Sequence, residues 1–209
     1  MTTAGRLIAI VGNGRVPEGC ARTIDAADLV IRFNECGSIG PGGARTDVIA
    51  VCNTGRPALA MLAGGRWKAK HAVLEAVEIW CTRDRATFAA LRAPLRSSHP
   101  DLDDFCDDYT DGYAAFAAAT GKRLKRLDAA VHRRTDAALA AFAPEAYVVP
   151  SSGLLVIAEV LANVTGADDR VVLAGFGHQG WIWHPFAAER RYVDHLVSEG
   201  RLARLHPLI

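Results

Sequence analysis

The sequence predicts a single α/β domain, a Rossmann-like sandwich in which helices flank a mainly parallel central sheet. Two observations predict this fold class. Short apolar runs typical of buried strands alternate along the chain with stretches of helical periodicity. The chain has 209 residues, 50% of them hydrophobic, which is enough for one sizeable core and leaves little room for a second. We therefore expect one domain over residues 1–209.

The predicted elements follow one another in a regular order. The strands are short apolar runs, at residues 7–11, 29–33, 48–52, 77–80, 147–149 and 171–174. The helices carry Ala and Leu with helical periodicity, at residues 57–62, 86–91, 113–119, 123–142 and 154–161. A last helix begins at Pro185, a residue that suits the first helical position.

Residues 97–111 interrupt this alternation and form a predicted irregular insertion. Its aspartates are Asp101, Asp103, Asp104, Asp107, Asp108 and Asp111. Their order lacks the central glycine and closing glutamate of a calcium loop, which favours a solvated acidic face. The basic residues that follow are Lys122, Arg123, Lys125, Arg126, Arg133 and Arg134. Three roles are open for these basic residues. They form a solvated helix face with intrahelical ion pairs, which is the default, or pair with the acidic segment, or contact an acidic substrate.

Charge and composition exclude several classes of partner. The 24 basic and 23 acidic side chains leave a net charge of +1, so no broad positive field exists for nucleic acid. No uncharged apolar segment approaches the roughly 18 residues that span a bilayer, and residues 1–6 do not resemble a signal peptide. The 5 cysteines lack closely spaced pairs, which argues against a disulfide scaffold and a zinc site. We expect a soluble, cytoplasmic protein without a bound metal.

A glycine loop directly follows the first predicted strand. Gly12, Asn13 and Gly14 would lie at the carboxyl edge of the sheet, where open α/β folds bind ligands. The next glycine, Gly19, comes too late for a dinucleotide fingerprint, so a nicotinamide cofactor is disfavoured. The loop is either a phosphate cradle formed by backbone amides or a tight turn.

The residues after this loop carry a resemblance to a known family. Ile24-Asp25, the strand end from Val30 to Asn34, Gly43 and Arg45-Thr46-Asp47 follow in order. This succession resembles the large sialyl motif of the sialyltransferases. The resemblance implies the sialyltransferase-like variant of the glycosyltransferase A fold. It also implies that Asn13 holds the donor phosphate and that Asn34 holds the cytidine or ribose.

A serine loop precedes the predicted helix at 154–161. Ser151, Ser152 and Gly153 lie where free helix amides favour an anion, although simple capping by serine explains the same pattern. Together with Val171 to Gly177, this segment resembles the small sialyl motif. By that resemblance the serine loop contacts a cytidine nucleotide, and Gly175 and Gly177 lie in the next loop against the ligand.

His184 and Glu189 have the spacing of the last sialyl motif. By resemblance His184 is the general base, and a neutral imidazole can take a proton from an acceptor hydroxyl near neutral pH. We expect the start of the last helix to disfavour its protonated form. Glu189 falls on the apolar face of that helix, so it needs a partner or a function. By resemblance it belongs with His184 to the catalytic residues, where we expect it to brace the last helix. The usual aromatic-rich motif before this histidine is compressed, and His178 is the candidate phosphate-binding histidine or a plain loop residue.

The resemblance implies an inverting, metal-independent glycosyltransferase without a cofactor. Its donor would be a CMP-linked acidic sugar, either sialic acid or Kdo, and its acceptor a glycan. The chain also looks like short bacterial proteins labelled urease operon accessory proteins. The alternative function is therefore a non-catalytic nucleotide-binding or assembly partner.

Overall fold

The computed structural model describes residues 5–205. Residues 1–4, which belong to the segment that does not resemble a signal peptide, and residues 206–209 lie outside the described range. Seven strands form one all-parallel sheet in the order β5-β4-β3-β2-β1-β6-β7. Their bounds are β1 Leu7–Val11, β2 Leu29–Phe33, β3 Val48–Val51, β4 Glu78–Cys81, β5 Arg123–Arg126, β6 Arg170–Ala174 and β7 Ala203–Arg204. The predicted single α/β domain with a parallel sheet is confirmed.

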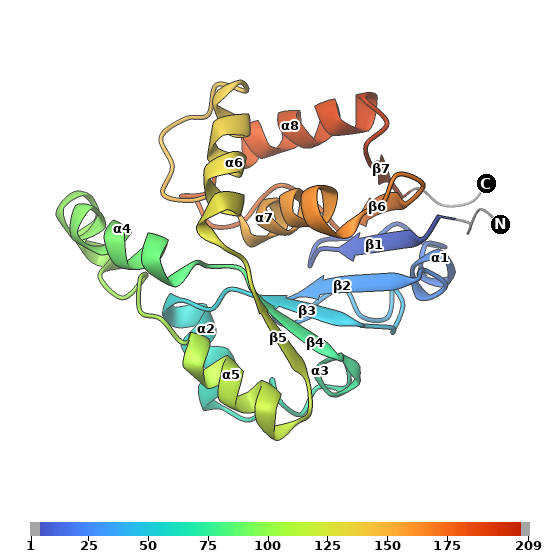
Figure 1. The fold of residues 1–209 in the computed structure, drawn as a ribbon, viewed down its shortest axis with the longest axis horizontal. Coiled ribbons are helices and arrows are strands. Elements are labelled where there is room, and N and C mark those ends of the chain that lie inside the picture. Colours follow the sequence, from blue (N-terminus) through green and yellow to red (C-terminus); the bar gives the residue numbers. More distant parts are fainter. Residues whose placement is uncertain (1–4, 206–209) are drawn as a thin grey trace.

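Helices connect successive strands except β2 and β3, which a loop joins, and the helices cover both faces of the sheet (Figure 1). Their bounds are α1 Ala21–Asp25, α2 Gly55–Ala63, α3 His71–Glu75, α4 Arg85–Ser98, α5 Thr110–Ala119, α6 Ala129–Ala140, α7 Ser152–Glu159 and α8 Phe186–Ser198. The α6, α7 and α8 helices lie on one face, and α2, α3 and α5 lie on the other.

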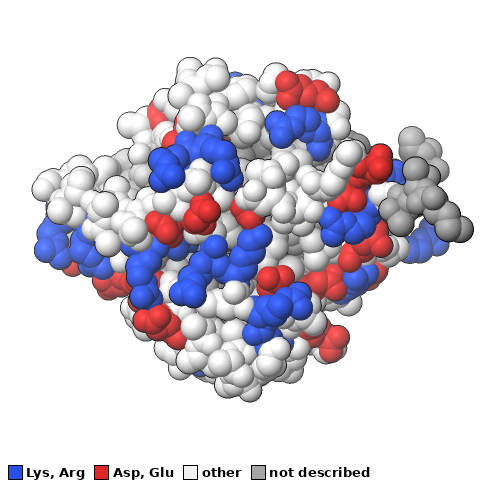
Figure 2. Space-filling model, viewed as in Figure 1, with Lys and Arg blue, Asp and Glu red and all other residues white. Residues whose placement is uncertain are grey.

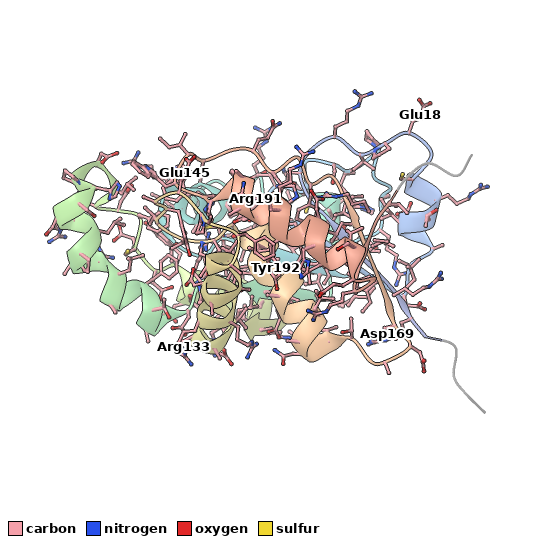
Figure 3. All side chains as sticks on the ribbon, turned by 90° about the horizontal axis from the view of Figure 1, so that it is seen from above. Glu18, Arg133, Glu145, Asp169, Arg191 and Tyr192 are labelled. Atoms are coloured by element: carbon pink, nitrogen blue, oxygen red, sulfur yellow. The ribbon has the colours of Figure 1, made fainter. Side chains whose placement is uncertain are left out.

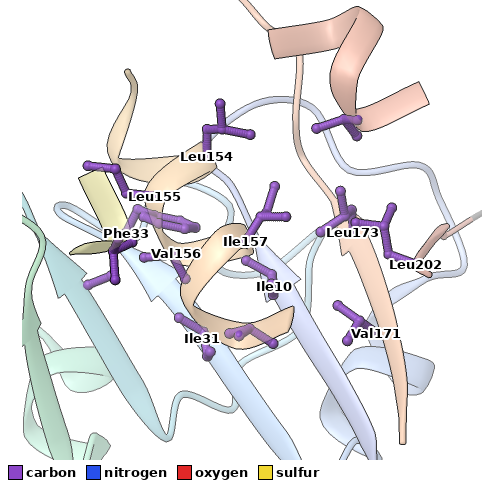
Figure 4. Packing of buried hydrophobic residues seen from close by; sticks show 14 of the residues in the cluster. Ile10, Ile31, Phe33, Leu154, Leu155, Val156, Ile157, Val171, Leu173 and Leu202 are labelled. Carbon is purple, nitrogen blue, oxygen red and sulfur yellow. The ribbon is translucent and has the colours of Figure 1, made fainter. Parts of the chain in front are cut away.

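The alternation of side chains along each strand builds a core on each face. Ile8 and Ile10 of β1 point toward α7 and α8, whereas Ala9 and Val11 point toward α1. Figure 4 shows α7 packed flat on the first of these cores, with its apolar residues 154–157 over the strands. Burial on both faces explains why the central strands read as short continuous apolar runs.

The last helix is tied down beside the end of α6. Arg191 donates from Nη2 to the backbone oxygens of Phe142 at 2.6 Å and Ala143 at 3.2 Å. Tyr192 packs against Phe142 with ring centroids 5.3 Å apart. Figure 3 shows Arg191 and Tyr192 on α8. These contacts fix α8, whose first turn carries Glu189.

Two predicted elements are wrong. Residues 123–142 form the edge strand β5 and then α6, because Asp128 caps a new helix by accepting from the amides of Ala130 and Val131. Residues 147–149 form no strand, since this segment leaves the sheet and its Val148 amide donates to Trp183. The last helix begins at Phe186, with Pro185 as its cap.

The predicted irregular insertion at 97–111 is shorter in the structure, because residues 97–98 end α4 and residues 110–111 begin α5. Residues 99–109 are irregular apart from one turn of 3-10 helix at Pro100–Leu102. The ion pairs of the acidic segment join Asp104 to Arg56, Asp107 to Arg92, and both Asp108 and Asp111 to Arg85. Of the alternatives left open for the basic run, pairing with this segment is not found among residues 5–205, since Arg123 and Lys125 pair with Glu78 and Glu159. Figure 2 shows basic and acidic groups interspersed over one face. None of the helices within residues 5–205 combines the length and apolarity that crossing a membrane requires.

Candidate functional site

A cavity of about 840 Å³ opens at the carboxyl edge of the sheet. Strands β2 to β5 run outward from β1 on one side, whereas β6 and β7 lie on its other side. The strand order thus reverses between β1 and β6, and ligands of open α/β sheets bind at such a switch point. The cavity wall includes every predicted site residue: Gly12, Asn13, Gly14, Asn34, Ser151, Ser152, Gly153, Gly175, Gly177, His178, His184 and Glu189.

The loops after β1 and β6 touch each other across the switch point. A Cβ on Gly12 would lie 2.4 Å from the Gly175 oxygen, and one on Gly14 would lie 2.8 Å from it, so side chains are excluded at both positions. The amides of Gly12 and Gly14 donate to Ala174 and Gly175. These two glycines therefore permit close approach of the loops, and their own amides are not free for a phosphate, which favours the tight turn of the two alternatives at these two positions.

Asn13 and Asn34 present the same group to the cavity. Oδ1 of Asn13 accepts from the Gly37 amide at 2.8 Å, and Oδ1 of Asn34 accepts from the Cys52 amide at 2.8 Å. Trp67 further holds the Asn34 backbone, which has a φ of 46°. Because both amide oxygens are engaged, each side chain offers its Nδ2 donors, which suit phosphate or carbonyl oxygens.

Three successive residues before α7 hold three ionisable side chains. The Val149 oxygen lies 2.8 Å from Nδ1 of His184, and the Pro150 oxygen accepts from Nη1 of Arg83 at 2.9 Å. The next amide, that of Ser151, donates to Oε1 of Glu189 at 2.6 Å. A segment without regular structure thus gathers a histidine, an arginine and a glutamate from distant parts of the chain.

His184 is held in one tautomer. A backbone carbonyl only accepts, so Nδ1 carries the proton and Nε2 keeps its lone pair. Burial, followed by the positive charge of Arg83, lowers the pKa of His184 to about 4. The pKa of His184 is thus lowered as expected, but by burial and Arg83 rather than by the start of the last helix. At neutral pH the imidazole is an unprotonated base whose orientation is fixed.

Glu189 is buried and braces the serine loop. Its second oxygen, Oε2, accepts from Oγ of Ser151 at 2.7 Å, so both carboxylate oxygens bind the same residue. Burial raises the pKa of Glu189, while the two Ser151 hydrogen bonds oppose that rise. Glu189 acts as a positioning residue that ties α8 to the start of α7.

The start of α7 keeps free donors beside the cavity. Ser151 caps the helix, since its Oγ accepts from the Leu154 amide at 3.2 Å. Within residues 5–205, the amides of Ser152 and Gly153 have no acceptor, as expected for a first turn. Ser152 Oγ lies 3.0 Å from Oγ1 of Thr82 at the end of β4. These amides and hydroxyls can bind an anion.

His178 lies in the loop that follows β6 and lines the cavity. Nη2 of Arg204 lies 3.3 Å from Nε2 of His178, and because a guanidinium only donates, the proton of His178 is on Nδ1. This Nδ1 is buried and has no partner among the described residues. Burial and the charge of Arg204 lower the pKa of His178 to about 4. The side chain is therefore a neutral donor with an unmet hydrogen bond.

Comparison with known proteins then decides the family. No protein-family model matches the chain. A protein named Urease operon 23 kDa accessory protein, from Rhizobium meliloti (strain 1021), is 64% identical over 204 residues, which are 98% of this chain and 94% of that protein. The chain belongs to the family of this urease operon accessory protein.

Solved structures similar to this family member are those of a mammalian sialyltransferase. One crystal structure matches with a TM-score of 0.54 and 16% identity over 96% of this chain and 69% of that chain. The complex with Gal-beta-1-3GalNAc-ortho-nitrophenol matches with a TM-score of 0.53 and 18% identity, with the same coverage. At these identities the likeness shows the fold alone, which this family member shares with the mammalian sialyltransferase.

The tryptophans of the compressed region pack against the protein in this family member. Trp181 stacks on Phe105 with ring centroids 4.9 Å apart and meets the His184 ring edge to face at 4.9 Å. Trp183 packs on His99 at 4.2 Å. Both tryptophans thus pack on neighbouring rings, and Trp181 also lines the cavity.

Sequence reasoning missed several cavity residues, above all Arg83. Thr54 and Arg56, which follow β3, and Phe105 of the acidic segment also line the cavity. Arg83 follows β4 by two residues, so the rule that ligands lie at the carboxyl ends of strands could have found it. Within residues 5–205, no three His, Cys, Asp or Glu side chains gather as a metal site.

Proposed function

We propose that this protein is an inverting, metal-independent glycosyltransferase. It transfers an acidic keto-sugar, sialic acid or Kdo, from a CMP-linked donor to a glycan acceptor, and it does so in the cytoplasm. The observation that carries the proposal is His184, a neutral base held by Val149 in a cavity that also contains the asparagine amides and the serine loop. The shared fold with a mammalian sialyltransferase supports the same reading.

In this mechanism Nε2 of His184 takes the proton of an acceptor hydroxyl. The acceptor oxygen forms a bond to the anomeric carbon of the donor, and the bond from that carbon to the phosphate oxygen of CMP breaks. Because attack comes from the face opposite the nucleotide, the configuration inverts. The proton passes from His184 to solvent after the product leaves.

The leaving phosphate needs donors rather than a metal. The Nδ2 groups of Asn13 and Asn34, the amides of Ser152 and Gly153 and the Nδ1 proton of His178 supply them. Each of these groups lacks an acceptor within residues 5–205. Neutral donors suit this role because they stabilise the departing phosphate without trapping CMP as tightly as fixed cations would.

Substitution of the base tests this proposal. We expect His184→Ala to keep CMP affinity within about threefold while the rate of sugar transfer falls about 100- to 10,000-fold, the usual range for loss of a general base. Transfer is followed as acceptor-dependent release of CMP. The exposed His71 provides the control, and His71→Ala should match the parent protein.

Two results would reject the assignment of His184. Unchanged transfer in His184→Ala would remove it as the base. Loss of CMP binding in the same variant would instead make it a ligand of the nucleotide phosphate.

A second candidate function is a nucleotide-binding accessory or assembly role in urease formation. The name of the 64% identical relative favours it. The same cavity would then bind CMP without turnover. A wild-type protein that binds CMP and never transfers sugar, whatever the acceptor, would support this second function.

A further inference from the structure

Arg83 is a buried cation whose backbone and side chain are both anchored. It is 3% exposed and lies between β4 and α4. Asn53 binds its backbone on both sides, accepting from the Arg83 amide at 2.8 Å and donating to the Arg83 oxygen at 3.0 Å. The guanidinium lies over the Phe88 ring at 5.4 Å and donates through Nη1 to Pro150. The side chain is therefore held in one place.

No carboxylate pairs directly with this guanidinium among the described residues. Nε is buried without a hydrogen-bond partner, and within residues 5–205 no acceptor is bound by Nη2 and no carboxylate forms an ion pair with Arg83. Of the carboxylates on the cavity wall, Asp104 pairs with Arg56. Glu189 is near enough for the charge of Arg83 to oppose the rise in its pKa that burial causes, but its two oxygens bind Ser151 and not the guanidinium. A buried cation whose donors meet no carboxylate is costly, which points to a ligand anion.

The position of Arg83 selects which anion this is. Arg83 and His184 bind the oxygens of successive residues, Pro150 and Val149, so the two side chains are neighbours. In a sugar derived from a 2-keto acid, the carboxylate is attached to the anomeric carbon itself. His184, as the base, must lie near this carbon during the attack. The carboxylate on the same carbon then lies near Arg83, the neighbour of His184. Of the proposed phosphate donors, Asn13 and His178 belong to the glycine loops, whereas Ser152 and Gly153 begin α7 next to Pro150.

We infer that Arg83 is the specificity residue of this site, binding the carboxylate carried on the anomeric carbon of the donor sugar. This inference rests on the proposed function. Nε and Nη2 form the forked pair of donors that matches the two oxygens of a carboxylate. Arg83 thereby distinguishes a CMP-linked acidic sugar from CMP itself and from neutral sugar nucleotides.

Calorimetric titration of three ligands separates this role from nucleotide binding. The probes are CMP, CMP-sialic acid and CMP-Kdo, titrated into the full chain and into Arg83→Gln and Arg83→Lys. We expect Arg83→Gln to weaken at least one acidic sugar nucleotide tenfold or more while CMP changes less than threefold. Arg83→Lys, which keeps the charge and loses the fork, should fall between. Arg85→Gln is the control, since Arg85 lies two residues away, pairs with Asp108 and Asp111 and does not line the cavity.

Each other outcome overturns the inference in a recognisable way. Equal weakening of CMP and of the sugar nucleotides would assign Arg83 to the phosphate and leave the proposed function intact. No weakening of any ligand would make Arg83 structural. A wild-type protein that binds CMP but gains nothing from either sugar would contradict carboxylate recognition, and one that binds none of the probes would remove the proposed function as well. If Arg83→Gln fails to fold, Arg83→Lys carries the comparison.

Discussion

Three histidines of this protein share one electrostatic character. Burial, complete for His132 and partial for His178 and His184, disfavours the imidazolium and lowers the pKa of each to about 4. Arginines add to this effect, Arg83 for His132 and His184 and Arg204 for His178. All three imidazoles are therefore neutral at pH 7, which keeps His184 ready to accept a proton.

These lowered pKa values predict acid instability. The unfolded histidines take up protons as the pH falls through about 6.5, whereas the folded ones resist until about 4. The contribution to stability is therefore full above pH 6.5 and is lost between pH 6.5 and 4. For the fully buried His132 we expect the free energy of unfolding in urea to fall by up to about 3 kcal/mol over this window, at about 1.4 kcal/mol per pH unit and proton. For the half-buried His178 and His184 we expect a smaller fall.

A substitution isolates the share of one histidine. His132 is 3% exposed, and its Nε2 lies 3.0 Å from the Thr82 oxygen, a bond that glutamine can keep. In His132→Gln the slope of unfolding free energy against pH should decrease by about one proton between pH 6.5 and 4. His71→Gln, at an exposed site, should leave the slope unchanged. Identical slopes in His132→Gln and the parent protein would contradict the account.

Side chains of the site divide into those the sequence reveals and those it does not. His184, Glu189 and the serine loop belong to sequence motifs whose resemblance to a family can be recognised. Arg83 belongs to no such motif, because its significance lies in burial without a paired carboxylate, which only the folded chain displays. The glycine amides show the converse, since their position was predictable and their engagement by Ala174 and Gly175 was not.

At the scale of elements, an ion pair links the edge strand β5 to the helix α7. Lys125 of β5 pairs with the buried Glu159 of α7. Nζ of Lys125 lies 2.7 Å from Oε1 of Glu159 and 4.4 Å from the centre of the Trp80 ring. Asn163 donates to the other oxygen of Glu159 at 2.7 Å. The side chain of Glu159 is only 5% exposed, so its charge requires this partner.

Removal of the lysine should therefore be costly. We expect Lys125→Ala to lower the free energy of unfolding by about 3 kcal/mol, because it leaves Glu159 as an uncompensated buried charge. Arg123→Ala on the same strand should cost less than about 1 kcal/mol, since Arg123 is 71% exposed and lies 3.6 Å from Glu78. Urea denaturation of both variants measures the difference. Equal losses would show that the pair does not anchor β5.

The predicted elements failed where tertiary contacts override local pattern. The strand β5 contains Arg, Lys and Arg, which favour a helix by propensity, yet the strand pairs with β4 at the edge of the sheet. Residues 147–149 have the apolar content of a strand, but their backbone oxygens and amides hold His184 and Trp183 instead. The central strands succeeded because burial on both faces leaves an unambiguous apolar run.

At the scale of the whole molecule, the site follows from the strand order. The strand order reverses between β1 and β6, which leaves an opening at the carboxyl edge of the sheet. The loops after β1, β2, β4 and β6 project residues into this opening. The fold class was predictable from periodicity alone. The cavity was not, because it depends on the irregular segments at 99–109 and 175–185, which carry no periodic signal.

Selective binding of CMP tests the central claim most directly. Calorimetric titration of the pure, metal-free protein compares CMP with GDP, UDP and NAD. The account predicts a one-to-one complex with CMP and at least tenfold weaker binding of the other nucleotides, since the site presents neutral donors for one phosphate at the switch point. Absence of CMP binding, or equal affinity for all four, would contradict the claim that this cavity is a cytidine nucleotide site.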